Sequence, residues 1–273
     1  MKKSIFLFSL LAFGSFAVVY YYWKQATQLP EWYISKEKTT TAQAAQIDFR
    51  NEAEVKTVKA RLQRNVDAKI ENSIEARQGL QSELSRRDGG GDEKAETNRI
   101  SNNNPQAELG NQNIEIDLSE KEVNDLVIST IAKDENSSKF LASTKALNTT
   151  IKNGQLESGV VFNVSEVPKE ELNQQEKQLL EKVVKTFPFL EEKEVYIGVE
   201  GKPKVEDGQL KLDGQTKIKV GNLSFTTAEL SQRLGIPQEK IEQRLKLELE
   251  LGRLKINDIE IKENNASIKG SVN

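Results

Sequence analysis

The chain has 273 residues but contains no cysteine and no histidine. These absences exclude disulfide bonds, thiolate nucleophiles and Ser-His-Asp triads, and they remove the usual nitrogen and sulfur ligands of zinc, copper and iron–sulfur sites. Carboxylate chemistry has no good candidate either. Acidic neighbours such as Glu170-Glu171 point to different sides of a helix or strand, and Asp207-Gly208 lacks the further oxygen ligands of a calcium loop. We therefore predict that the protein is not an enzyme, and we expect no catalytic, metal-binding or cofactor-binding residues.

Aromatic residues and an excess of one charge are also scarce. The chain carries 39 basic and 42 acidic residues, which gives a net charge of −3, and it has no basic stripe with interleaved aromatic residues. Both tryptophans, Trp23 and Trp32, lie near the N-terminus together with four of the five tyrosines. The remainder of the chain therefore lacks platforms on which bases stack, and we expect no nucleic-acid partner.

One long apolar run is present, Ile5–Trp23, and Lys2 and Lys3 precede it. As a helix, its 19 residues span roughly the 30 Å hydrocarbon core of a bilayer. The aromatic residues Tyr20–Trp23 are typical of a membrane interface, and the basic flank favours a cytoplasmic N-terminus. We therefore predict a single-pass transmembrane anchor over residues 1–24 in a plasma or inner membrane, with the lipid bilayer as a partner and the bulk of the chain extracytoplasmic.

A cleaved signal peptide is the alternative interpretation of this segment. The tripeptide Ser15-Phe16-Ala17 loosely fits a small-x-small cleavage site after the apolar residues Ile5–Phe13. Apolar residues continue through Val18 and Val19, where a cleaved signal usually becomes polar. The uncleaved anchor is therefore favoured.

Residues 25–113 form three further segments. We predict a juxtamembrane linker over residues 25–49 and a flexible linker over residues 88–113, which is rich in glycine, asparagine and serine. Residues 50–87 contain no proline and predict one long amphipathic helix. Its apolar stripe has the spacing of a straight helix and consists of Val55, Val58, Leu62, Val66, Ile70, Ile74, Leu80 and Leu84. This helix is either a solvated stalk or a surface for a partner helix or for the protein's own domain.

Residues 114–273 predict an extracytoplasmic α+β domain. Alternating apolar residues over 114–118 indicate a strand, and Ser119 with Glu122 matches a capping box for the helix that follows. Further helices are expected over about 169–186, from Thr226 or Thr227 to Gly235, and from Pro237 to about Leu249. In the last of these the leucines also alternate as they would in a strand, so that both alternatives stay open, with helix favoured.

Three hairpins supply the predicted antiparallel sheet. If Asn153-Gly154 is a two-residue turn, Leu147 lies opposite Val160. With Asp207-Gly208 as the second turn, apolar residues again share one face and charged residues the other, an arrangement that a one-residue slip would invert. The third hairpin ends the chain and has a bulge at Asn257-Asp258. The predicted architecture is therefore α+β: an N-terminal transmembrane helix, a long helical stalk and a C-terminal antiparallel sheet of hairpins packed on helices.

Three stretches carry a resemblance to a known family. They are IDLSEKEVNDLVISTIA, YIGVEGKPKVEDGQLKLDGQTKIKVGNLSF and INDIEIKENNASIKG. Their order resembles bacterial single-pass extracytoplasmic proteins of the YpmS type. More distantly, it is similar to tubular lipid-binding (TULIP-like) domains, in which a curved sheet wraps a long helix around acyl chains. The resemblance covers roughly residues 114–273 and implies lipid binding without catalytic residues.

These features predict a non-catalytic domain that binds a lipid or another apolar ligand. The candidate ligand face is the apolar face of the sheet: Val160, Phe162, Val164, Ile197, Val199, Ile218, Val220 and Phe225. The alternative for these residues is a closed core. The alternative function is a scaffold or adaptor of an envelope protein complex, which would bind its protein partner through the helix at residues 50–87.

Overall fold

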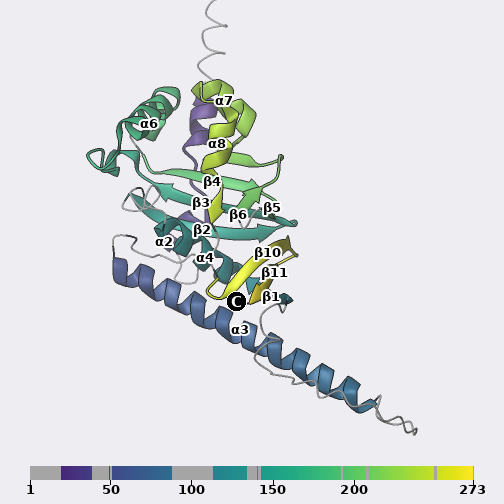
Figure 1. Cartoon of the computed structure of the whole chain (residues 1–273). Helices are drawn as coiled ribbons and strands as arrows, with labels where there is room; N and C mark the ends of the chain where they lie inside the picture. Colours follow the sequence, from purple (N-terminus) through teal and green to yellow (C-terminus); the bar gives the residue numbers. More distant parts are fainter. Residues whose placement is uncertain are drawn as a thin grey trace, which may run out of the picture.

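The structure is a computed structural model (Figure 1). It describes residues 20–38, 49, 51–87, 113–133, 140, 143–191, 193–206, 209–248 and 251–272. Within these residues the fold is α+β, and every strand pair is antiparallel. The predicted α+β class with antiparallel hairpins is therefore confirmed, but the strands form three sheets instead of one.

The first sheet has the strand order β1-β11-β10. Its strands are β1 (Asn113–Ser119), β10 (Leu254–Ile261) and β11 (Asn265–Val272). The register of β10 against β11 shifts between Ile256 and Asp258, which confirms the predicted bulge. Strand β1 leads directly into α4 (Glu120–Lys133) through the predicted capping box, in which the Ser119 amide donates to Glu122 Oε2 at 2.9 Å.

The second sheet has five strands in the order β2-β3-β4-β7-β8. They are β2 (Thr144–Lys152), β3 (Gln155–Phe162), β4 (Val195–Gly201), β7 (Lys217–Val220) and β8 (Leu223–Thr226). Asn153 and Gly154 both have positive φ, 54° and 69°, as a two-residue turn of this kind requires. Leu147 pairs with Val160, so the predicted register of this hairpin is confirmed.

The third sheet has the order β5-β6-β9 and contains β5 (Pro203–Glu206), β6 (Gln209–Leu212) and β9 (Leu247–Glu248). Pro203 pairs with Leu212, as the second predicted hairpin requires, and its turn at Asp207-Gly208 lies outside the described residues. The favoured helix up to Leu249 is wrong in its last part. Helix α8 (Gln238–Arg244) ends early, because Leu247 pairs with Leu210 as a strand.

Three helices cover one face of the five-stranded sheet: α6 (Gln174–Thr186), α7 (Thr227–Leu234) and α8. Two short 3₁₀ turns flank α6, namely η2 (Val164–Glu166) and η3 (Pro188–Leu190). Figure 1 shows α6, α7 and α8 at one end of the molecule and α3 (Glu52–Arg87) at the opposite end.

The long helix α3 is not a free stalk. Its residues Val58, Leu62, Val66 and Ile70 are at most 4% exposed and pack into the core formed with α4 and β1. The stripe therefore serves the protein's own domain over this part of the helix. Beyond it, α3 extends past the body of the protein, and Leu80 is 62% exposed (Figure 1).

The described helices do not support the predicted membrane anchor. Within the residues that the structure describes, no helix is long and apolar enough to cross a membrane. This finding contradicts the transmembrane helix of the predicted fold and the predicted single-pass location in a plasma or inner membrane. Residues 5–19 of the predicted span, including the end at Ile5, lie outside the described residues.

The described N-terminal segment instead packs on the second face of the five-stranded sheet. Trp23, the other predicted end of the span, lies with its ring centroid 4.4 Å from Lys193 Nζ. The Gln25 carbonyl accepts a hydrogen bond of 2.9 Å from the Asn222 amide. In α2 (Glu31–Lys38), which falls in the predicted linker, the Trp32 ring meets the Tyr196 ring edge to face. The sheet face that was predicted to carry the charged residues is therefore partly covered.

Candidate apolar binding groove

Most of the predicted ligand face lies beneath α6, α7 and α8. Val160, Ile197 and Val220 lie side by side across β3, β4 and β7, and Ile218 pairs with Phe225. Four of the eight predicted residues are almost fully buried, Val164, Ile218, Val220 and Phe225, and the others are half-buried. The structure thus brings six of these side chains together as packed core beneath the three helices, whereas Val160 packs against a separate cluster with Val127 and Leu147, and Val199 is in neither cluster.

Helix α6 is anchored at its start but only loosely packed along its length. Asn173 and Glu176 form a reciprocal capping box: the Asn173 amide donates to Glu176 Oε2 at 2.8 Å, and the Glu176 amide donates to Asn173 Oδ1 at 3.0 Å. No apolar side chain of α6 is fully buried, and Leu179 is 38% exposed. The apolar face of α6 is therefore incompletely covered by the rest of the fold.

Helices α7 and α8 form a tight pair opposite α6. Thr226 and Glu229 form a third capping box at the start of α7, and the hydrogen bonds from Thr226 lower the pKa of Glu229. Gly235 ends α7 with φ 62°, a left-handed conformation that glycine adopts without steric cost. Pro237 then begins α8, so the chain reverses over three residues and turns Ile236 toward the space beside α6.

A groove of about 520 Å³ lies between α6, α7 and α8. Seven apolar side chains line it: Leu179, Val183, Leu230, Leu234, Ile236, Ile241 and Leu245. The other lining residues are Gln175, Gln178, Lys182, Lys240 and Arg244. This volume lies within the range of small-molecule sites, which are mostly apolar with a few polar groups at defined positions.

Three cations surround the apolar groove. Lys182 extends from α6, and Lys240 and Arg244 extend from α8. Among the described residues that line the groove, none is acidic. None of the three cations forms an ion pair within the described part of the chain. The groove therefore combines an apolar lining with three cations that form no ion pair within the described residues.

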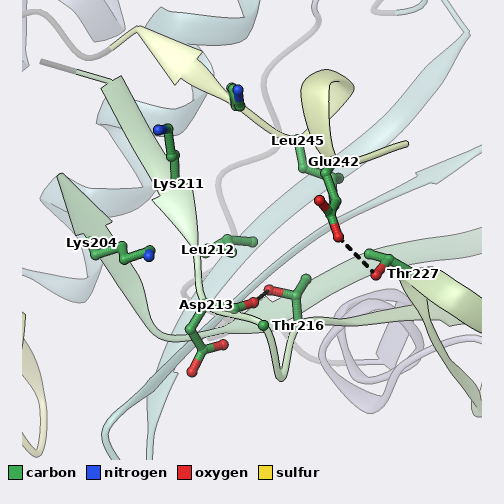
Figure 2. A pocket seen from close by; sticks show the side chains of 10 residues that line it. Lys204, Lys211, Leu212, Asp213, Thr216, Thr227, Glu242 and Leu245 are labelled. Carbon is green, nitrogen blue, oxygen red and sulfur yellow. Dashed lines mark hydrogen bonds between the residues drawn. The ribbon is translucent and has the colours of Figure 1, made fainter. Parts of the chain in front are cut away.

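A second pocket, of about 300 Å³, lies between the third sheet and α8 and has a different character (Figure 2). Two of the three lysines that line it, Lys204 and Lys211, form ion pairs with Glu206, at 2.6 and 2.7 Å, and the third is Lys246. The contact with Lys204 and, after it, the contact with Lys211 lower the pKa of Glu206 to about 2. Figure 2 shows Glu242 reaching toward Thr227, with Thr227 Oγ1 and Glu242 Oε1 3.4 Å apart. The positive charge of Lys204 and Lys211 is therefore already balanced, and the acids Asp213 and Glu242 also line this pocket.

A third cavity, of about 530 Å³, lies on the other side of α6 and is lined by Val164, Leu180 and Val184 among others. Its lysines are accompanied by the acids Glu181 and Glu191. Of the predicted ligand face, only Val164 lines one of these cavities. Lysines and glutamates both line this third cavity, so it is a weaker candidate for a defined ligand than the groove.

Tyr196 lies at the centre of a polar cluster on the opposite face of the five-stranded sheet. Its hydroxyl donates to Glu157 at 2.8 Å, and burial, reinforced by the Glu157 carboxylate, raises the pKa of Tyr196. Lys219 lies between Glu157 and Glu200 at 2.6 Å from each. Each charge in the cluster has a partner, so we interpret the cluster as one that stabilises the fold. Within the described residues, no group of three or more acidic side chains has the arrangement to hold a metal ion.

Sequence reasoning missed the groove because its lining comes from three separate helices. The signal in the sequence is local: Leu179 and Val183 are four residues apart, as are Ile241 and Leu245. Only the packing of α6 beside α7 joins these pairs into one surface.

No family model, curated protein or solved structure matches this chain at a significant level. The resemblance to YpmS-type and tubular lipid-binding proteins therefore stays a prediction.

Proposed function

We propose that the protein is a non-catalytic binding protein for an apolar ligand, which it holds in the groove between α6, α7 and α8. The observation that carries the proposal is the incomplete burial of the apolar face of α6, with Leu179 38% exposed at the edge of an apolar groove. Full burial of a leucine side chain contributes roughly 1.5–3 kcal/mol, so a ligand that covers this surface gains part of that free energy.

The test uses the uncharged fluorescent probe N-phenylnaphthylamine with the full-length protein. Its emission should rise on titration, and Leu179→Asp should weaken its binding at least about tenfold, since a charge would then lie in the apolar groove. The matched control is Leu80→Asp, because Leu80 is 62% exposed at the far end of α3. Absence of probe binding, or an equal effect of the two substitutions, would contradict the proposal.

An adaptor function through α3 is the second candidate. The exposed Leu80 favours it, because this part of the apolar stripe lies beyond the core of the protein. Deleting all of residues 50–87 would remove core side chains, so the test is an internal deletion of residues 76–87. This deletion should abolish co-purification of protein partners and preserve the melting temperature. An unchanged set of partners would show that the end of α3 is not a binding surface.

A further inference from the structure

We propose that the ligand of this groove is a single-chain amphiphile with an anionic head group, and that Lys182, Lys240 and Arg244 bind the head. This inference rests on the proposed function and specifies its ligand class. The apolar tail would lie along the groove, and the head group would lie at the edge where the two helices present their cations.

The positions of the three cations support this assignment. Lys240 and Arg244 are four residues apart on α8, which places them on one face of the helix. Like charges at this spacing destabilise a helix slightly when no counter-charge is present. Lys182 adds a third positive charge from α6, next to the apolar Val183. An anion between the helices would relieve this repulsion and lie beside the apolar lining.

Two half-buried lysines elsewhere in the described fold are held in ion pairs with carboxylates. Lys219 lies between Glu157 and Glu200, and Lys145 contacts Glu166 at 2.6 Å. The chain has 42 acidic residues, so carboxylates are abundant. None of the carboxylates that the structure describes lines the groove. Charge complementarity therefore favours an anionic occupant over a neutral one.

The size of the groove favours a small amphiphile over an acidic peptide helix. Helix α8 has seven residues and the groove has about 520 Å³, within the range for small ligands. A helical peptide ligand would need a longer apolar surface for anchors at spacings of three, four and seven residues.

Two fluorescent probes with the same ring system test the head group. Anilinonaphthalene sulfonate carries a sulfonate that N-phenylnaphthylamine lacks. We expect the full-length protein to bind the anionic probe about tenfold more tightly than the neutral probe in low salt, because three weak exposed charge contacts act together. This preference should largely disappear at roughly 1 M salt, where the screening length falls to about 3 Å.

The triple variant Lys182→Gln, Lys240→Gln and Arg244→Gln should weaken the anionic probe about tenfold and change the neutral probe by less than about twofold. Its matched control is Lys56→Gln, Lys59→Gln and Arg64→Gln on α3, which removes the same charge from exposed positions at the other end of the molecule. The control should leave the affinities for both probes unchanged.

The outcomes separate the two proposals. If neither probe binds, the proposed function is wrong. If both bind equally, or the two triple variants behave alike, the anionic head group is wrong and the apolar site stands. Competition completes the test: dodecanoate should displace the anionic probe at lower concentration than dodecanol. Displacement by an acidic amphipathic peptide and not by dodecanoate would overturn the choice of an amphiphile.

Discussion

Arg61 on α3 and Asp125 on α4 form a bidentate ion pair. Arg61 Nε lies 2.9 Å from Asp125 Oδ2, and Nη2 lies 2.6 Å from Oδ1. The Asp125 side chain is 2% exposed and the Arg61 side chain is 33% exposed. A planar guanidinium fits a carboxylate in this geometry, whereas a lysine would make a single contact. The pair therefore fixes α3 against the domain at a defined rotation.

Arg61→Ala should lower the free energy of unfolding by about 2–3 kcal/mol. This value is below the usual cost of breaking a fully buried pair, because a third of the Arg61 side chain is in solvent. Urea unfolding measures the change. In a double-mutant cycle with Asp125→Asn, the two single effects should sum to more than the effect of the double variant. An effect of Arg61→Ala below about 0.5 kcal/mol would contradict this role.

Glu122 should make stability depend on pH in the acid range. Burial raises its pKa, but hydrogen bonds from Lys69 and from Ser119 outweigh burial, so that the pKa lies below the ordinary value of 4.5. A carboxylate with a lowered pKa in the folded state stabilises the protein above the unfolded-state pKa. That contribution is lost as the pH falls through the folded-state pKa.

Glu122→Gln should therefore be less stable than the parent protein by about 1–2 kcal/mol at neutral pH, since charged hydrogen bonds are lost. The difference should shrink as the pH falls below about 4.5. Thermal unfolding at several pH values measures it. The control is Glu83→Gln, an exposed glutamate on α3. A difference that stays constant with pH would show that the Glu122 charge is not the cause.

Local patterns predicted much of the fold. The register of the hairpin at Asn153-Gly154 follows from turn chemistry and alternation, and the capping box of Ser119 follows from spacing within four residues. Both features depend only on residues that are close together in the sequence, so local patterns are sufficient to predict them. The strand β9 depends on a pairing of Leu247 with Leu210 that no local pattern shows, and helix was wrongly favoured there.

The sequence left the role of α3 and the location of the groove open. The stripe with Val66 and Ile70 shows that one face of α3 is apolar, but not whether the protein itself covers that face. The groove likewise requires α6 to lie beside α7, which depends on tertiary packing. The place of Leu179 in the groove could not be predicted locally, because the residues that line the groove with it come from other helices as well.

Gly159 should not tolerate a side chain, because a Cβ atom there would overlap the ring of Tyr196. Gly159→Ala should cost about 1–3 kcal/mol of stability, as overpacking does, and should change the tryptophan fluorescence because Trp32 contacts Tyr196. The matched control is Gly214→Ala, since nothing lies within 4 Å of a Cβ at that position. Adding Tyr196→Ala to Gly159→Ala should cost less than the sum of the single changes. Additive costs would show that the ring is not the obstacle.

Ile70 and Leu80 provide the most direct test of whether α3 belongs to the folded domain. Ile70 is fully buried, whereas Leu80 is 62% exposed on the same helix. Ile70→Ala should lower the free energy of unfolding by about 2–5 kcal/mol, because it leaves a cavity between α3, α4 and β1. Leu80→Ala should change it by less than about 0.5 kcal/mol. Chemical denaturation with a circular dichroism readout measures both. If α3 were a free stalk, both substitutions would have the same small effect, so equal values would contradict the docking of α3.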